Sequence, residues 1–293
     1  KNQGVLPMIT SCSPGWIKFC ETYYPEFIPN LSSCKSPHEM MGAMIKTYYA
    51  QKAGIDPEKI AVVSVMPCTA KKFEAGREEL SNNGMPDVDE VITTRELAHM
   101  IKEAGIDFVN LPDEDFDGLM GESTGAGVIF GATGGVMEAA LRTAYKLITD
   151  NELDDVDFQA VRGTEGIKEA TVKVGDLDVS VAVAHGTGNA AKLLDMIKSG
   201  EKKYTFIEVM GCPGGCVTGG GQPIVSAQDK MTCDPRALRA AALYREDAGK
   251  AKRKSHENAE VQKLYEEFLG HPNSHKAHEL LHTHYVKREK YGK

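Results

Sequence analysis

The sequence of 293 residues has no apolar run of the ~18 residues that a membrane-spanning helix requires. It also lacks an excess of basic residues, because 34 lysines and arginines stand against 42 aspartates and glutamates and give a formal net charge of −8. A nucleic-acid binder needs a basic face. The first residues show no charged and then apolar stretch typical of a secretory signal. We therefore expect neither a membrane nor a nucleic acid as a partner.

The seven cysteines are an odd number, scattered through a chain too long to need disulfide staples. This usage indicates a reducing compartment, so we expect a cytoplasmic protein whose thiols serve as ligands or reactive groups. With 41% hydrophobic and 26% charged residues, the composition is that of a globular protein. The chain starts at Lys1 and reaches its first cysteine at residue 12, which suggests a piece of a longer polypeptide.

One glycine-rich stretch, residues 208–223, carries two cysteines four positions apart, Cys212 and Cys216. It follows an apolar run over 204–210 that predicts a buried strand. Glycine lets the backbone approach a bulky group closely, and thiolates are soft ligands for iron–sulfur clusters, zinc and copper(I). The stretch is consistent with a loop around an inorganic cluster, or with a glycine-rich turn that holds two free thiols.

Two further predicted strands each lead into a cysteine. The β-branched run over 59–66 is typical of a buried parallel strand and runs into Cys68, and a shorter apolar run precedes Cys12. Open α/β sheets place their sites at such carboxyl ends. Cys20, Cys34 and Cys233 sit in no metal spacing and are expected to be small buried hydrophobes.

Four thiols on three loops match the ligand count of a cubane iron–sulfur cluster and also that of a closed zinc site. Zinc sites more often use two local Cys-x-x-Cys pairs. Zinc also gives no reason for Met66, Lys71 and Met210 beside the cysteines.

The remaining pattern is that of alternating strands and helices. We predict helices over 38–52, 94–104, 136–149, 188–199, 235–249 and 255–269, a strand over 91–93, and a hairpin over 168–184. Ser36 is the expected N-cap of the first helix and Thr94 that of the second. The glycine-rich run 121–135 lacks nucleotide-binding spacing, and the basic run 250–254 is expected to be a solvated face.

Near the C-terminus, His278 and His282 fit the His-Glu-x-x-His pattern of zinc proteases. Only eleven residues follow, so a third protein ligand would have to come from His284 or from elsewhere. We expect this helix to bind no metal and to dock through Leu280, Leu281 and Tyr285.

Three motifs in order resemble the signature loops of the [FeFe]-hydrogenases. They are Thr-Ser-Cys-Ser-Pro-Gly-Trp (10–16), Met-Pro-Cys-Thr-Ala-Lys-Lys-Phe-Glu (66–74) and Glu-Val-Met-Gly-Cys-Pro-Gly-Gly-Cys-Val-Thr-Gly-Gly-Gly-Gln-Pro (208–223). The resemblance extends to residues 131–142 and 252–258 and covers nearly the whole chain. It implies the reaction 2H⁺ + 2e⁻ ⇌ H₂, with H₂ and protons as substrates.

The resemblance implies an H-cluster, a [4Fe–4S] cubane bridged by one cysteine to a two-iron unit with CO, cyanide and an azadithiolate. By motif position Cys216 is the bridging ligand, and Cys68 and Cys212 hold the cubane. Lys71 would hydrogen-bond a cyanide and should therefore be buried. Met66 and Met210 would line the two-iron unit.

The sequence departs from the family pattern in its first loop. The family commonly has two adjacent cysteines there, a proton-donating thiol and a cubane ligand, which align with Cys12 and Ser13. Either Ser13 ligates through oxygen, a poor substitute for thiolate, or Cys12 takes the cubane. The serine form is similar to catalytic subunits of multimeric NAD(P)-linked, electron-bifurcating hydrogenases. Of the family's proton path, Cys12 and Ser32 are present.

The expected fold is α/β, with two lobes of mostly parallel sheet flanked by helices and the cluster in the cleft between them. We place an N-terminally incomplete first lobe at 1–85, a second lobe at 86–249 and a helical segment at 250–293. Electrons would come from ferredoxin or from NAD(P)-linked domains or subunits.

Two other functions belong to the same resemblance. One is a hydrogenase-like iron–sulfur protein of cluster assembly that makes no hydrogen, and such relatives tend to lose the surroundings of the two-iron unit. The presence of Lys71, Met66 and Met210 favours the enzyme. The other is a sensory hydrogenase, which would need a signalling domain.

Overall fold

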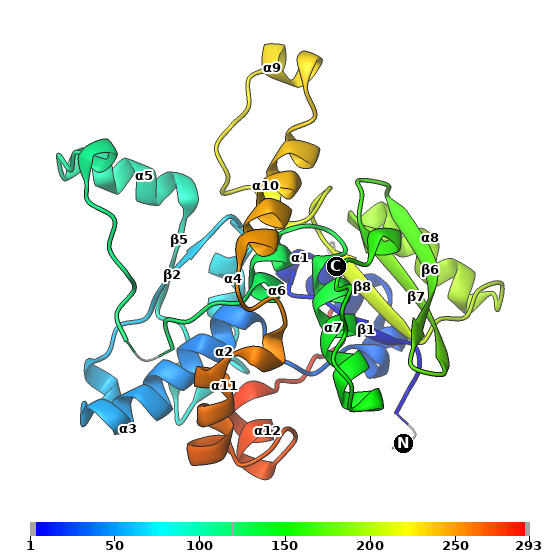
Figure 1. Ribbon diagram of the computed structural model, residues 1–293, viewed down its shortest axis with the longest axis horizontal. Coiled ribbons are helices and arrows are strands. Elements are labelled where there is room, and N and C mark those ends of the chain that lie inside the picture. Colours follow the sequence, from blue (N-terminus) through cyan, green and yellow to red (C-terminus); the bar gives the residue numbers. More distant parts are fainter. Residues whose placement is uncertain (1–3, 119, 291–293) are drawn as a thin grey trace.

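A four-stranded sheet forms the larger of two parallel-sheet units. The computed structural model describes residues 4–118 and 120–290. The strand order is β1 (Met8–Thr10), β8 (Phe206–Met210), β7 (Leu177–His185) and β6 (Ile167–Val174). The first three strands are parallel, and β6 forms the expected antiparallel hairpin with β7 (Figure 1).

The second sheet has two parallel strands, β2 (Val63–Met66) and β5 (Glu90–Thr93), and lies on the other side of the molecule (Figure 1). A small hairpin, β3 (Ser81–Asn82) and β4 (Met85–Pro86), precedes β5. The expected α/β class is therefore confirmed. The range 1–85 contributes to both sheets, because it contains β1 of the first sheet and β2 of the second.

The described residues also form α-helices of very different lengths. They are α1 (Pro14–Tyr23), α2 (Pro37–Met44), α3 (Ala50–Ala53), α4 (Lys71–Ala75), α5 (Thr94–Glu103), α6 (Gly125–Val128), α7 (Gly135–Thr149), α8 (Thr187–Lys198), α9 (Ala227–Thr232), α10 (Pro235–Gly249), α11 (Ala259–Leu264) and α12 (His275–Leu281). Among the described residues no helix is long and apolar enough to cross a membrane.

The helices predicted over 38–52 and 255–269 are each interrupted in the structure. A π-helical turn, Ile45–Tyr49, joins α2 to α3, and a second one, Tyr265–Leu269, follows α11. Asn258 caps α11 and separates it from a short 3₁₀ turn, Ser255–Glu257, so the expected helix over 255–269 is broken. A wider turn inserts one residue without ending the helix, and the hydrophobic period does not reveal it.

The large sheet is buried on both faces. On β7, Ala182 and Ala184 pack with Trp16 and Leu193 in the cluster beneath α1 and α8. The alternating residues Val181 and Val183 pack with Met137 of α7 on the opposite face. This alternation follows from the two-residue period of a strand, and it packs both faces of β7 into a core.

The C-terminal segment docks as expected. Leu280 and Leu281 of α12 are buried against Ala43 and Met44 of α2, and Tyr285 packs against the sheet cluster that contains Trp16.

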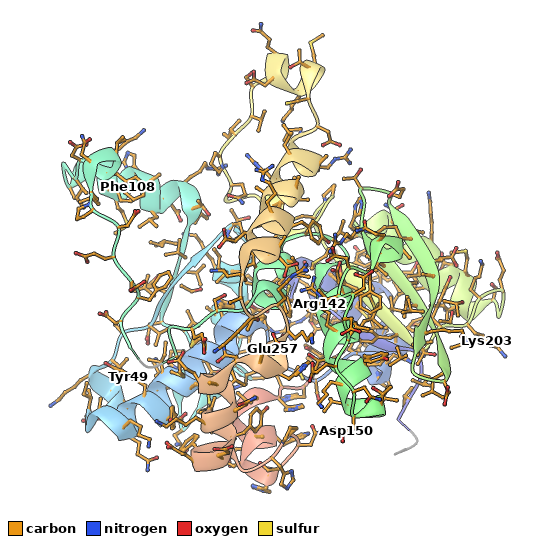
Figure 2. The ribbon with its side chains drawn as sticks, in the orientation of Figure 1. Tyr49, Phe108, Arg142, Asp150, Lys203 and Glu257 are labelled. Carbon is orange, nitrogen blue, oxygen red and sulfur yellow. The ribbon has the colours of Figure 1, made fainter. Side chains whose placement is uncertain are left out.

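The basic run 250–254 is not a solvated face, contrary to the expectation. Arg253 donates to Asp157 and Asp247, and the largely buried side chain of Lys254 pairs with Glu152 at 2.6 Å. Asp247 also pairs with the fully buried Arg142, which lies in the interior of the molecule (Figure 2). The run therefore fastens the C-terminal segment to α7 and α10.

Candidate metal centre

Parallel pairing brings the first and third cysteine loops together. Thr10 at the end of β1 pairs with Glu208 near the end of β8, so the residues that follow both strands leave the same edge of the sheet. Cys12 and Cys212 lie on these two loops. A sequence separation of about 200 residues is thereby closed by three residues of strand pairing.

The second cysteine loop leaves the other sheet and contacts the third loop directly. Gly221 N–H donates to the carbonyl of Pro67 at 3.0 Å, next to Cys68. A Cβ placed on Gly219 would overlap that same carbonyl oxygen. The glycines after Cys216 are thus required by close packing of two backbones, as the sequence indicates.

Ser13 faces the third loop. A Cβ on Gly211 would overlap the Ser13 hydroxyl oxygen, so this hydroxyl lies beside the residue that precedes Cys212. Ser13 is also the N-cap residue of α1, yet its side chain makes no capping hydrogen bond. Its oxygen is therefore directed away from the helix terminus and toward the loop that carries Cys212.

The four thiols interact with one another and form no disulfide. A hydrogen bond with the Cys216 thiol lowers the pKa of Cys12, and the Lys71 ammonium lowers it further, against the effect of burial. The same hydrogen bond, together with burial, raises the pKa of Cys216 well above its ordinary value. Burial raises the pKa of Cys212, with a contribution from the charge of Cys68.

The spacing of these thiols argues against a single zinc ion. Tetrahedral zinc with bonds near 2.3 Å would hold its sulfurs roughly 3.8 Å apart. Within residues 4–118 and 120–290, the one cluster of three ligand-type atoms mutually within 4.8 Å is His38, Glu39 and Glu74, and it contains no cysteine. A cubane separates its cysteine sulfurs by roughly 6 Å and fits an open set of soft donors better.

Lys71 begins α4 and is buried, as expected, with 6% of its surface exposed. Its ammonium lies 2.6 Å from Glu74 Oε2. The same ammonium acts on Cys12 and Cys216, so it is close to the thiols. A buried lysine needs an anionic partner, and the partner that the sequence analysis missed is Glu74. The signal was available, because Glu74 stands three residues after Lys71 on a helix.

The two methionines lie at the ends of strands that lead into cysteine loops. Met210 ends β8 and is 1% exposed. Met66 ends β2 and packs in part against Val91 and its neighbours in the core of the second sheet.

Ser32 lies beside β1 at the base of the Cys12 loop. Its N–H donates to the carbonyl of Ile9 at 2.8 Å, and its hydroxyl accepts a hydrogen bond from Cys34 N–H at 3.4 Å. The Tyr285 hydroxyl donates to the Ser32 carbonyl at 3.2 Å. The C-terminal segment therefore fixes the position of Ser32.

Glu208 is a second residue whose role the sequence analysis missed. It is fully buried in β8, and its carboxylate accepts the N–H groups of Gly134 at 2.6 Å and Met137 at 2.7 Å. Burial raises the pKa of Glu208, although these two hydrogen bonds oppose the shift. A charged residue inside an apolar strand was the available signal, and its role is to fasten β8 to the N-terminus of α7.

His278 and His282 of the His-Glu-x-x-His pattern contact each other and a serine. The rings of His278 and His282 stack with centroids 4.4 Å apart, and His282 Nδ1 lies 2.8 Å from the Ser33 hydroxyl. These contacts attach α12 to the segment that follows Ser32.

Family models match most of this chain. Residues 1–220 match the family model described as iron only hydrogenase large subunit, C-terminal domain. The chain belongs to this iron-only hydrogenase family. Residues 233–288 match a second model, described as iron hydrogenase small subunit.

Curated relatives and solved structures extend the match over nearly the whole chain. The NADP-reducing hydrogenase subunit HndD of Solidesulfovibrio fructosivorans is 56% identical over 97% of this chain and 48% of its own length. Iron hydrogenase 1 of Clostridium pasteurianum is 50% identical over 98% of this chain and 50% of its own length. A solved [FeFe]-hydrogenase of Chlamydomonas reinhardtii is 44% identical, with a TM-score of 0.82 over 97% of this chain and 77% of that chain.

The chain thus spans about half the length of these curated relatives. A more distant group is also similar. Cytosolic iron-sulfur assembly component 3 of Rattus norvegicus is 33% identical over 97% of this chain and 60% of its own length. The hydrogenase relatives are therefore markedly more similar in sequence than this assembly protein.

Proposed function

We propose that this chain is the H-cluster domain of an [FeFe]-hydrogenase that catalyses 2H⁺ + 2e⁻ ⇌ H₂. The observation that carries the proposal is the meeting of three cysteine loops beside a buried lysine. The H-cluster, a [4Fe–4S] cubane joined to a two-iron unit with CO, cyanide and azadithiolate, would supply the redox chemistry on hydrogen.

The protein would hold this cofactor with soft donors. Cys68 and Cys212 would bind the cubane, and Cys216 would bridge it to the two-iron unit. Two residues can complete the cubane. Ser13 is favoured because its hydroxyl is directed toward the loop of Cys212, whereas Cys12 is the better ligand chemically.

The remaining site residues would orient the two-iron unit and deliver protons. Lys71 would donate to a cyanide, because a buried ammonium favours an anion. Met66 and Met210 would contribute apolar walls. Cys12 would move protons, since a thiol has a pKa within a few units of working pH, and Ser32 would belong to the same path.

Electron transfer partners follow from the family. The similarity to an NADP-reducing subunit and to a small-subunit model supports a multi-subunit assembly. We propose ferredoxin or NAD(P)-linked subunits as partners and the cytoplasm as the location. Residues 1–85 and 86–249 would supply the two lobes around the cluster, and 250–293 a helical clasp.

The alternative function is cluster assembly without hydrogen chemistry, which the assembly relatives favour. The buried Lys71 argues for the enzyme, because cluster storage needs no buried cation near the thiols. Both functions call for bound iron and sulfide, so metal content alone does not separate them.

The test is reconstitution followed by infrared spectroscopy. The full chain, loaded with iron and sulfide and then matured, should show bands of bound CO and cyanide and should produce H₂ from a reduced dye. A matched Lys71→Met variant should keep the cubane iron but lose the two-iron unit. Cubane iron without CO or cyanide bands in the parent chain would favour the assembly function.

A further inference from the structure

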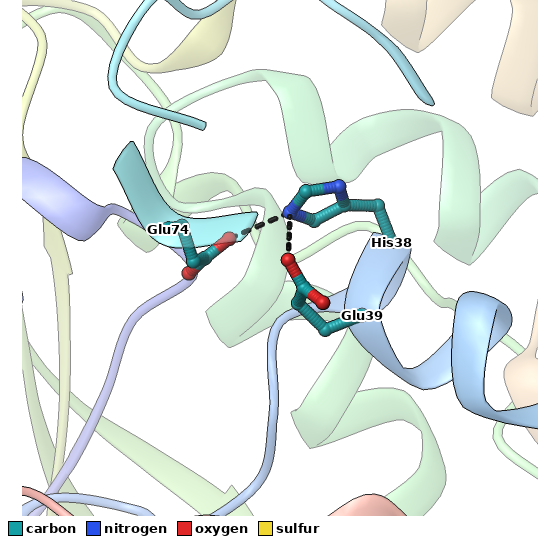
Figure 3. A group of neighbouring side chains, drawn as sticks. All are labelled: His38, Glu39 and Glu74. Atoms are coloured by element: carbon teal, nitrogen blue, oxygen red, sulfur yellow. Dashed lines mark hydrogen bonds and ion pairs between the residues drawn. The ribbon is translucent and has the colours of Figure 1, made fainter. Parts of the chain in front are cut away.

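A buried acidic cluster lies directly behind Lys71. His38 and Glu39 of α2 face Glu74 of α4 (Figure 3). His38 Nε2 is 2.6 Å from Glu74 Oε2 and 3.3 Å from Glu39 Oε1. Glu39 has no exposed surface. None of these three residues is assigned a role in the hydrogen chemistry above.

The two carboxylates differ in their hydrogen bonding. Glu74 Oε2 accepts hydrogen bonds from Lys71 at 2.6 Å, from His38 at 2.6 Å and from the Ser36 hydroxyl at 2.8 Å. Both oxygens of Glu39 are buried and have no hydrogen-bond partner. An ionised carboxylate that is neither hydrogen-bonded nor exposed carries a desolvation cost that the neutral acid avoids. The surroundings of Glu74 therefore stabilise its ionised form, and those of Glu39 favour its protonated, neutral form.

We propose that Glu39 is a protonated carboxylic acid in the folded protein at neutral pH, and that its ionisation sets the charge around Lys71. The proposal makes Glu39 a positioning residue that acts on Lys71 through Glu74. Its significance for hydrogen chemistry rests on the proposed function, whereas its protonation does not.

Burial, together with neighbouring charges, brings the pKa of Glu39 close to neutral pH. Burial raises the pKa of Glu39 to about 8, with further contributions from Glu74 and Asp87. Lys71 and Lys35 oppose the shift, but Lys35 is itself paired with Asp87 at 2.6 Å.

The adjacent groups keep fixed charges while Glu39 titrates. Burial lowers the pKa of His38, which favours the neutral ring. Burial alone would raise the pKa of Glu74, but the hydrogen bond from His38 and the charge of Lys71 hold it below its ordinary value. With Glu39 protonated, the charges of Lys71 and Glu74 cancel. Ionisation of Glu39 leaves one net negative charge beside an ammonium that must attract an anion.

A bound divalent cation is the other reading of this cluster, because a histidine and two carboxylates within 4.8 Å are a metal-ligand set. Two observations oppose it. The nearest oxygen of Glu74 already accepts three hydrogen bonds, and one of its donors is the ammonium of Lys71. A cation would have to displace these donors and sit beside a positive charge.

The test is infrared difference spectroscopy of the full chain before any cluster is loaded. The parent protein should show the carbonyl band of a protonated carboxylic acid that disappears as pH rises through about 8. Glu39→Gln should remove this band, and His38→Gln should shift its midpoint. The exposed Glu103→Gln is the matched control and should change neither.

Three results would overturn the proposal. One is a Glu39 that is already ionised at pH 6. Another is an acid band unaffected by Glu39→Gln. The third is stoichiometric Mn²⁺ or Zn²⁺ binding that Glu39→Gln abolishes. None of these results depends on hydrogenase activity, so they are separate from failure of the proposed function.

A second measurement uses the loaded enzyme. If the proposed function holds, the turnover of the parent chain should fall as pH rises through about 8. Glu39→Gln should remove this fall in turnover while keeping activity at pH 7 within a few fold of the parent. If Glu39→Gln loses turnover above pH 8 as the parent does, Glu39 does not act on Lys71.

Discussion

Replacing Gly219 by alanine tests whether the second and third cysteine loops must touch. A Cβ on Gly219 would overlap the carbonyl oxygen of Pro67 and would lie 3.2 Å from the carbonyl oxygen of Cys216. A carbon and a carbonyl oxygen approach to roughly 3.3 Å, so the two loops must separate by on the order of 1 Å. Overpacking of this kind costs about 1–3 kcal/mol. The backbone of Gly219 suits alanine, so the effect is one of space alone.

The expected result is loss of metal without loss of the fold. Gly219→Ala should lower the melting temperature by several degrees and retain well under half of the iron bound by the parent after reconstitution and desalting. Gly188→Ala is the matched control, because a Cβ there meets nothing within 4 Å and Gly188 lies in the first turn of α8. It should keep all iron and gain a few tenths of a kcal/mol. Equal iron retention by both variants would refute the argument from loop contact.

Three further predictions test roles proposed for individual residues. Cys12→Ser should keep its iron and lose turnover by orders of magnitude, because serine's hydroxyl is too weak an acid to relay protons, whereas Ser13→Ala should lose iron. Iron lost from the first variant and kept by the second would make Cys12 the cubane ligand. Glu208→Gln should destabilise the fold by about 2–3 kcal/mol in urea titrations, unlike the exposed Glu201→Gln, since one buried N–H loses its acceptor. Burial lowers the pKa of Lys168 to about 8, so unfolding free energy should rise between about pH 8 and 10.5, and Lys168→Met should abolish that rise.

The strand ends that carry the cysteines could be predicted from sequence, because each is an apolar run that breaks into glycine or proline. The expected strand over 204–210 is β8, and the expected run over 59–66 contains β2. The expected N-cap of the helix over 94–104 was wrong by one residue. Thr93 rather than Thr94 caps α5, since Thr93 and Glu96 exchange the reciprocal hydrogen bonds of a capping box. Two adjacent threonines offer the same side chain, and only the helix start decides between them.

The pairing of the strands could not be predicted in the same way. The local sequence of residues 8–10 does not predict that they pair in parallel with 206–208. That pairing depends on the burial of Ile9 and Ile207 in the same core. The polar contacts behind the site were hidden for a similar reason. His38 and Glu74 are 36 residues apart, and their hydrogen bond depends on how α2 packs beside α4.

The two-sheet arrangement explains why the site needs three loops. Cys12 and Cys212 leave the four-stranded sheet, whereas Cys68 leaves the two-stranded sheet, whose strand β2 exposes Val63 at 55% and Val65 at 42%. A parallel pair of strands covered on one face is weakly held by its own core. A cluster bound by thiols from both sheets would join them covalently, and binding energy that exists only in the folded state would stabilise the smaller sheet. The cofactor would then be part of the fold as well as of the chemistry.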